Sequence, residues 1–270
     1  MPLETPKDTI AKAPKSKRPT YKDEGKAWPS VTTILHVIDA PALDKWRVRQ
    51  ALKGIDSYED FSAADTGTLL HAVIAHHLDP EGQPAPAIAE WPAPVALAAR
   101  NSYKGYLAWR KDHTVRPILL EHSMASAALG YAGTPDFYGE VDGHLEVVDW
   151  KTSARVYPEY FIQTAAYAQL LHAKYPEHTP FRLRVICFSK DKPGTYTEDV
   201  IEVPECGDHL KAFGAALTIM QAQARIAEAA VKRKAPAFTP PLEAGDKCKH
   251  GYVPAAACPY EAECPMEVAP

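Results

Sequence analysis

The chain has 270 residues, of which 46% are hydrophobic, which is enough for a sizeable core. The formal net charge of -4 excludes a uniformly basic coat, so any contact with nucleic acid must come from a local patch. The chain contains no apolar run of the roughly eighteen residues that a membrane helix needs and no apolar segment of signal-peptide type near residue 1. We therefore expect a soluble, cytoplasmic protein.

The N-terminal third favours a polar arm followed by helices. Residues 1–27 are Lys-rich and broken by prolines, which predicts a flexible basic arm. Pro29 and Ser30 precede an apolar run that is either a helix start or a short strand, and helical spacing follows over 42–54. Residues 62–78 carry the apolar stripe of a helix, made by Leu69, Leu70, Val73, Ile74 and Leu78.

The middle and the end of the chain alternate between strand and helix patterns. A Pro-rich loop over 79–94 precedes a helix from about 95 to 112. The later segments are predicted as strands at 116–126, 130–141, 144–153, 181–189 and 195–203, and as helices at 158–175 and 207–231. This order predicts an α/β fold with a mixed central sheet flanked by helices.

The stretch LEVVDWKTS (145–153) reads as a buried strand that carries an acid and a base. Because side chains on a strand alternate, Val147, Asp149 and Lys151 share one face. Buried ions are costly unless they are paired, hydrated or bound to a metal. Taken alone, the dipeptide is also compatible with a structural Asp–Lys pair at a strand end.

A second carboxylate is expected beside the first. Asp142-Gly143 has the composition of a two-residue hairpin turn, and Asp136 and Asp149 each lie six residues from it. Residues directly opposite in an antiparallel pair have Cβ atoms about 5 Å apart, so the two carboxylates would repel each other. A hard divalent cation such as Mg²⁺ or Mn²⁺ would resolve that repulsion. Lys151 could then assist a water or neutralise charge on a phosphate.

These residues resemble the metal-binding core of the PD-(D/E)XK nuclease superfamily, and more specifically its RecB-type and mitochondrial-genome-maintenance-type exonuclease branch. The resemblance rests on Asp136 followed by Asp149-Trp150-Lys151, on the QTAAY motif that supplies Gln163 and Tyr167, and on His71 in GTLLH. PSVTTIL and LDKW also look like the N-terminal part of phage and bacterial members. The resemblance spans roughly residues 28–205 and implies a restriction-endonuclease-like core.

The resemblance also implies roles for individual residues. Asp136, Asp149 and the main-chain carbonyl of Trp150 would be metal ligands, and His71 would complete or flank that site. Lys151 would serve the attacking water, and Gln163 and Tyr167 would position the substrate strand or the lysine. Glu121 stands where relatives often carry an acidic residue near the metals, with a strand-surface charge as the alternative.

The activity implied is a Mg²⁺- or Mn²⁺-dependent DNA exonuclease acting on single strands or ends. A structure-specific endonuclease for flaps or branches is an alternative, and so is a non-catalytic DNA-binding assembly protein that retains the nuclease fold. The residues considered for base stacking are Trp28, Trp46, Tyr131 and Trp150, and those considered for phosphates are Lys45, Arg47 and Arg49.

Three regions are therefore expected: an arm at 1–27, a nuclease domain at 28–234, and a Pro-rich linker with a Cys/His tail at 235–270. The tail holds four candidate ligands for a second metal, namely Cys248, His250, Cys258 and Cys264. Tetrahedral Zn²⁺ suits mixed thiolate and imidazole ligands, although the spacings follow no standard finger. Some RecB-type nucleases hold an iron–sulfur cluster instead, and unligated thiols are the third alternative.

Overall fold

The computed structural model describes residues 21–38, 44, 47–49, 51–52, 54 and 62–232. The predicted arm up to residue 20, much of the predicted helix at 42–54, and the whole Cys/His tail lie outside the described residues, so these remain predictions. The residues contact one another mainly within two compact units, 1–221 and 222–270. The second unit is described only over residues 222–232.

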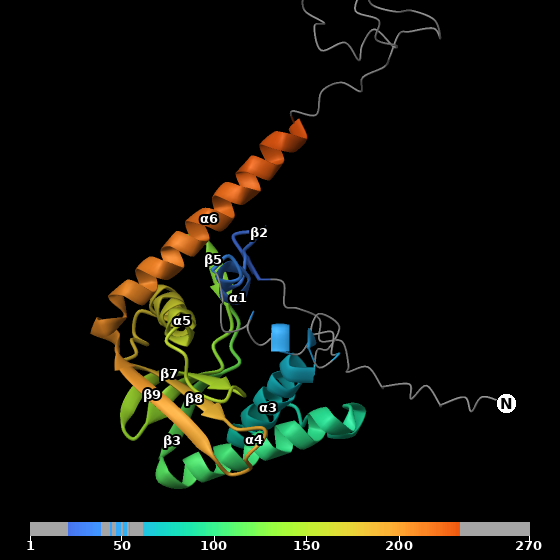
Figure 1. Ribbon diagram of the computed structural model, residues 1–270. Helices are drawn as coiled ribbons and strands as arrows, with labels where there is room; N and C mark the ends of the chain where they lie inside the picture. Colours follow the sequence, from blue (N-terminus) through green and yellow to red (C-terminus); the bar gives the residue numbers. More distant parts are fainter. Residues whose placement is uncertain are drawn as a thin grey trace, which may run out of the picture. The chain divides into compact units, whose positions relative to one another are not determined.

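A five-stranded mixed sheet forms the centre of the first unit (Figure 1). Its strands lie in the order β3-β6-β7-β8-β9, and only β7 and β8 run parallel within it. The bounds are β3 Val115–Leu120, β6 Phe137–Val141, β7 His144–Lys151, β8 Arg182–Phe188 and β9 Tyr196–Glu202. The predicted mixed α/β architecture is thus confirmed.

The β6–β7 hairpin has the predicted turn and register. Asp142 and Gly143 both adopt positive φ, 52° and 80°, as the tight hairpin turn requires. The strands pair from Val141 opposite His144 to Phe137 opposite Val148. One further step of the same register brings position 136 opposite position 149.

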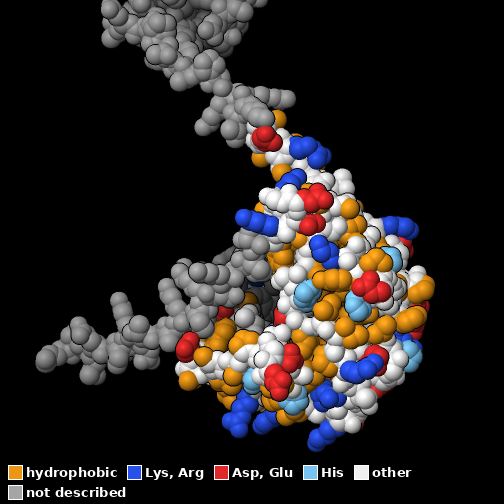
Figure 2. All heavy atoms as spheres, turned by 180° about the vertical axis from the view of Figure 1, so that it is seen from behind, with side chains coloured by type: hydrophobic (Ala, Val, Ile, Leu, Met, Phe, Trp, Pro, Cys, Tyr) orange, Lys and Arg blue, Asp and Glu red, His pale blue; other side chains and the backbone are white. Residues whose placement is uncertain are grey.

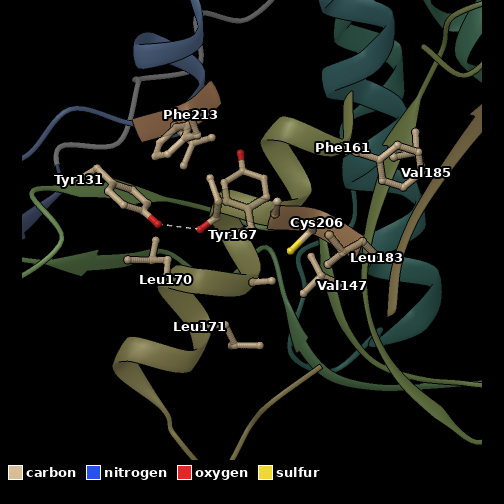
Figure 3. Close-up of a cluster of buried hydrophobic side chains, with 14 of the residues drawn as sticks. Tyr131, Val147, Phe161, Tyr167, Leu170, Leu171, Leu183, Val185, Cys206 and Phe213 are labelled. Atoms are coloured by element: carbon tan, nitrogen blue, oxygen red, sulfur yellow. Dashed lines mark hydrogen bonds between the residues drawn. The ribbon is translucent and has the colours of Figure 1, made fainter. Parts of the chain in front are cut away.

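Helix α5 (Tyr160–Lys174) covers one face of the sheet, and it connects β7 to its parallel neighbour β8. Beneath it lies a core to which β7, β8 and α6 (Gly207–Lys232) all contribute (Figure 3). Tyr131 donates a hydrogen bond to the main-chain oxygen of Ala166, at 3.0 Å. The short helix α1 (Val31–Leu35) packs on α5 and is capped by Ser30, whose hydroxyl accepts a hydrogen bond from the Thr33 N–H.

Helices α3 (Ser62–Leu78) and α4 (Ala93–Asp112) pack on each other, and α4 contacts β8 and β9. A second core, of aromatic and aliphatic side chains in equal number, lies between these helices and the other face of the sheet. Its fully buried members include Tyr106, Trp109, Phe137, Trp150 and Phe188. Val148 and Trp150 therefore belong to this core while Val147 belongs to the one under α5, as the alternation along β7 predicted.

Two predicted strands are each divided into two. The segment 116–126 breaks at Glu121, which has a φ of 45°, and gives β3 and β4 (Met124–Ser126). The segment 130–141 breaks around Pro135 and gives β5 (Tyr131–Gly133) and β6. Strands β4 and β5 pair as a separate two-stranded sheet. The continuous strands expected at 116–126 and 130–141 were therefore wrong.

Several short elements complete the described part of the chain. Strands β1 (Lys22–Asp23) and β2 (Lys26–Ala27) pair within the segment predicted as an arm. The Pro-rich loop contains the 3-10 turn η1 (Ile88–Glu90), and η2 (Val203–Cys206) leads into α6. On the face drawn in Figure 2, Lys and Arg side chains are interspersed with Asp and Glu. Among the described residues, no helix combines the length and apolarity needed to span a membrane.

A buried ion pair spans β7 and β8 and offers a test of the sheet. The Arg184 guanidinium donates to both oxygens of Glu146, at 2.6 and 3.0 Å, and the Glu146 side chain is fully buried. Glu146→Ala should lower the free energy of unfolding by about 3 kcal/mol, because it leaves a buried guanidinium with only Glu198 to balance it. Urea unfolding followed by circular dichroism measures this change.

Glu140→Ala on the neighbouring strand is the matched control. Glu140 pairs with Arg116, whose side chain is exposed, and its loss should cost at most about 1 kcal/mol. Equal costs for the two variants would contradict the assignment of Glu146 to a structural pair.

Candidate active site

The hairpin brings Asp136 and Asp149 to the same end of the sheet. Both side chains are buried, at 6% and 1% exposure. The Asp136 side chain is held by strand β7, because its Oδ2 accepts a hydrogen bond of 2.8 Å from the Trp150 N–H. Its other oxygen, Oδ1, lies 3.3 Å from the Nδ1 atom of His71. Extension of the hairpin register places position 136 opposite position 149, as the sequence predicted.

His71 enters this end of the sheet from α3. Its Nε2 donates to the main-chain oxygen of Trp150 at 2.8 Å, and its Nδ1 lies 3.3 Å from Asp136 and 3.6 Å from Glu121. The break in the strand at Glu121 places that residue beside Asp136, since the Glu121 N–H donates to the Asp136 main-chain oxygen at 3.1 Å. One ligand atom from each of His71, Glu121 and Asp136 lies within 4.8 Å of the others, a group that could hold a metal ion.

Lys151 and Asp149 form the adjacent half of the site. The Lys151 ammonium lies 2.5 Å from Asp149 Oδ2 and donates to Gln163 Oε1 at 3.2 Å. Gln163 in turn donates to the Tyr167 hydroxyl at 3.1 Å. Gln163 and Tyr167 are four residues apart on α5 and therefore lie on the same face of the helix, as the QTAAY motif predicted. Gln163 is the member of this pair that contacts Lys151.

Burial and the charges of neighbouring side chains shift the pKa values of the ionisable groups in this cluster. Burial raises the pKa of Asp149 to about 6 against the opposing effect of the Lys151 charge. Burial also opposes ionisation of Asp136, but the charges of His71 and Lys151 outweigh it and hold the Asp136 pKa below its usual range. The carboxylates of Asp136 and Glu121 outweigh burial at His71 and raise its pKa well above the ordinary value.

The donor set fits a divalent cation. Asp149 Oδ1 is buried and has no hydrogen-bond partner among the described residues, whereas Asp149 Oδ2 has the Lys151 ammonium and Glu121 Oε1 has only the His71 ring, at 3.6 Å. Buried acceptors normally have partners, so Asp149 Oδ1 has room for a ligand. Carboxylate oxygens with one imidazole suit Mg²⁺ or Mn²⁺. Asp149 is not part of the compact His71–Glu121–Asp136 group and faces Lys151 instead.

Two of the proposed base-stacking aromatics were wrong. Tyr131 and Trp150 are 2% and 1% exposed and belong to the two cores, so neither can meet a base. Trp28 is half-buried and lies under the Lys26 ammonium, while Trp46 and Lys45 lie outside the described residues. Arg47 is described and pairs with Asp44, and Arg49 is also described.

Sequence reasoning missed the tyrosine beside the lysine. The ring centre of Tyr160, at the first turn of α5, lies 5.3 Å from the Lys151 ammonium. A signal for it was present, because Tyr160 precedes Gln163 by three residues and so lies on the same face of the helix.

Comparison with known proteins gives the class. A model of the PD-(D/E)XK nuclease superfamily matches residues 40–265, and the chain belongs to this superfamily, whose members are typically metal-dependent phosphodiesterases. Among solved structures, the chain is similar to an alkaline exonuclease (LHK-Exo) from Laribacter hongkongensis, with 15% identity and a TM-score of 0.37 over 76% of this chain and 94% of that one. The same exonuclease in complex with dAMP aligns with 13% identity and a TM-score of 0.33 over 77% and 95%. No curated protein sequence matches.

Binding of Mn²⁺ should be measurable without any substrate. A ligand that binds only the folded state stabilises it by about 2.7 kcal/mol at a concentration one hundred times its dissociation constant. We expect Mn²⁺ to raise the melting temperature of the protein, and we expect Asp136→Asn to abolish that rise because it removes the carboxylate at the centre of the ligand group. Differential scanning calorimetry with and without Mn²⁺ tests this.

Glu140→Gln is the control, since it removes a carboxylate from the same strand away from the ligand group. An unchanged Mn²⁺ response in Asp136→Asn would contradict the metal assignment.

Proposed function

We propose that this protein is a Mg²⁺- or Mn²⁺-dependent deoxyribonuclease that acts as an exonuclease on single-stranded DNA or DNA ends. The observation that carries the proposal is the group of Asp136, Glu121 and His71 beside the Asp149–Lys151 pair, in which the buried Asp149 Oδ1 has no hydrogen-bond partner among the described residues. A structural ion pair alone would have no use for these additional carboxylates, which are costly to bury together.

Each half of the site has a separate task in this proposal. Asp136, Glu121 and His71 would hold the cation, with Asp149 and the Trp150 carbonyl as further oxygens at its edge. When bound, a divalent cation would supply an electrophile that offsets the negative charge of the phosphoryl oxygens. The chain's own residues orient this end of the sheet and exclude bulk water from the carboxylates.

Lys151 is the chain's own positive charge at the reacting phosphate. Asp149 and Gln163 hold its ammonium in one position, so the charge needs no rearrangement when the phosphate becomes more negative. A water oxygen attacks phosphorus, the bond from phosphorus to the 3′ oxygen breaks, and a 5′-phosphate and a 3′-hydroxyl result. The proton lost by the water passes to solvent, and the leaving oxygen takes one up. No side chain forms a covalent intermediate.

The form of the DNA substrate separates exonuclease from endonuclease. We expect linear single strands, and duplexes through their ends, to be degraded in Mg²⁺ or Mn²⁺, with no product when the metal is chelated. Circular single strands of the same sequence should stay intact, because a circle offers no end. Labelled substrates resolved on denaturing gels measure this, and cleavage of circles or of flap junctions would select the endonuclease alternative.

The residue roles predict a loss of turnover without a loss of folding. Lys151→Ala and Asp149→Asn should each lower the rate of cleavage by a factor of about 100 or more, because each removes a group that acts on the reacting phosphate or its metal. The melting temperature of Asp149→Asn should stay close to that of the unaltered protein because this change removes a buried charge, Lys151→Ala should remain folded by circular dichroism, and Glu140→Gln should keep full activity. Normal cleavage by Asp149→Asn in Mg²⁺ would refute the proposal, and an inactive unaltered protein that binds DNA would favour the non-catalytic alternative.

A further inference from the structure

Four side chains between Lys151 and Tyr160 form a continuous series of charge–ring and ring–ring contacts. The Lys151 ammonium lies 5.3 Å from the centre of the Tyr160 ring. The Tyr160 and Tyr157 rings meet edge to face with centroids 5.5 Å apart. The Arg155 guanidinium then lies 4.8 Å from the centre of the Tyr157 ring. We call Lys151, Tyr160, Tyr157 and Arg155 the aromatic ladder.

The aromatic ladder leads outward from the candidate active site. Lys151, Tyr160 and Tyr157 are half-buried, and Arg155 is exposed. The backbone of this stretch is fixed at both ends, by β7 up to Lys151 and by α5 from Tyr160. Within it, the Ser153 hydroxyl donates to the Arg155 main-chain oxygen at 3.0 Å. The rings are thus presented from a short constrained segment and not from a long loop.

The Arg155 guanidinium contacts the Tyr157 ring but makes no ion pair within the described part of the chain. Among the described residues no carboxylate lies within ion-pair distance of its guanidinium, whereas Arg116, Arg182 and Arg184 each pair with a glutamate. A guanidinium without an ion pair over a half-buried tyrosine ring is a combination that can stack on a base through the exposed part of the ring and bind a phosphate. Single-stranded nucleic acid offers these two groups in alternation, and proteins bind it with aromatic rings and cationic side chains together.

We propose that Tyr157 and Arg155 bind the nucleotide next to the reacting phosphodiester, with the base on the Tyr157 ring and its phosphate at Arg155. The inference rests on the proposed function, and it specifies the substrate class as an unpaired strand, because a base within a duplex already stacks on its neighbours. Tyr160 is a positioning residue that connects this nucleotide site to Lys151.

The test measures DNA binding separately from cleavage. A fluorescein-labelled single-stranded oligonucleotide and a blunt duplex of the same length are titrated with the full-length protein in Ca²⁺ in place of Mg²⁺, and anisotropy gives the dissociation constants. Tyr157→Ala should weaken single-strand binding by about tenfold, since one stacked base is lost. Tyr157→Phe should bind as the unaltered protein does, and the duplex should be affected less than the single strand.

Arg155→Gln gives an independent measure through salt dependence. Loss of one phosphate contact on a single strand should lower the slope of log Kd against log salt concentration by about 0.7. Arg116→Gln is the matched control, because Arg116 is an exposed arginine on β3 outside the aromatic ladder, and its slope should not change. Circular dichroism establishes that each variant is folded, and Arg155→Gln keeps the proposal testable if Tyr157→Ala does not fold.

The outcomes separate this inference from the proposed function. If the unaltered protein cleaves DNA and both Tyr157→Ala and Arg155→Gln bind single strands within twofold of it, the nucleotide site is wrong and the nuclease proposal stands. Equal losses on single strand and duplex would also overturn the inference, since an unpaired base would then not be what Tyr157 binds. If the unaltered protein neither binds nor cleaves DNA with any metal, both proposals fail.

Discussion

The β6–β7 register is the constraint on which the candidate active site depends. The turn at Asp142-Gly143 sets which residues face each other along the hairpin, and a slip of one residue would send Asp149 and Lys151 to the opposite core. The two faces of the hairpin are buried against different helices, so a slip would also expose or bury the wrong side chains along the whole of β7. Packing over the full sheet therefore enforces the position of two carboxylates at its end.

Holding those carboxylates together is costly, and the surrounding residues reduce the cost unevenly. Asp136 has His71 and the Trp150 N–H as partners, and its pKa is lowered despite burial. Asp149 has Lys151, but burial prevails and raises its pKa to about 6. The unequal compensation leaves acceptor capacity unused at Asp149 and Glu121. A bound dication would give these carboxylate oxygens a partner, which is consistent with the metal-dependent chemistry typical of the superfamily.

Local patterns predicted the parts of this protein that depend on local physics. The turn, the hairpin register, the helix at 62–78 and the Gln163–Tyr167 pair all follow from spacing and turn chemistry, and the structure confirms them. The break at Glu121 could not be predicted in this way, because a positive φ at a non-glycine residue is imposed by tertiary contacts, here with the Asp136 backbone. Tyr131 and Trp150 were misjudged for a related reason, since aromatic residues serve both cores and stacking surfaces, and only the three-dimensional packing separates the two.

The position of Lys151 depends both on local sequence pattern and on the tertiary fold. Its ammonium is held by a strand neighbour, by Gln163 from the helix that crosses over that strand, and by the Tyr160 ring one turn earlier in the same helix. The crossover from β7 to the parallel strand β8 is what brings the helix back over the end of the strand, so the sheet topology itself delivers these partners to the lysine. The same short connection between β7 and α5 places Tyr157 and Arg155 at the protein surface beside the candidate active site. This segment links the Asp149–Lys151 pair at the end of β7 to the surface where, in our proposal, an unpaired strand would enter, and a change in its length would disturb both at once.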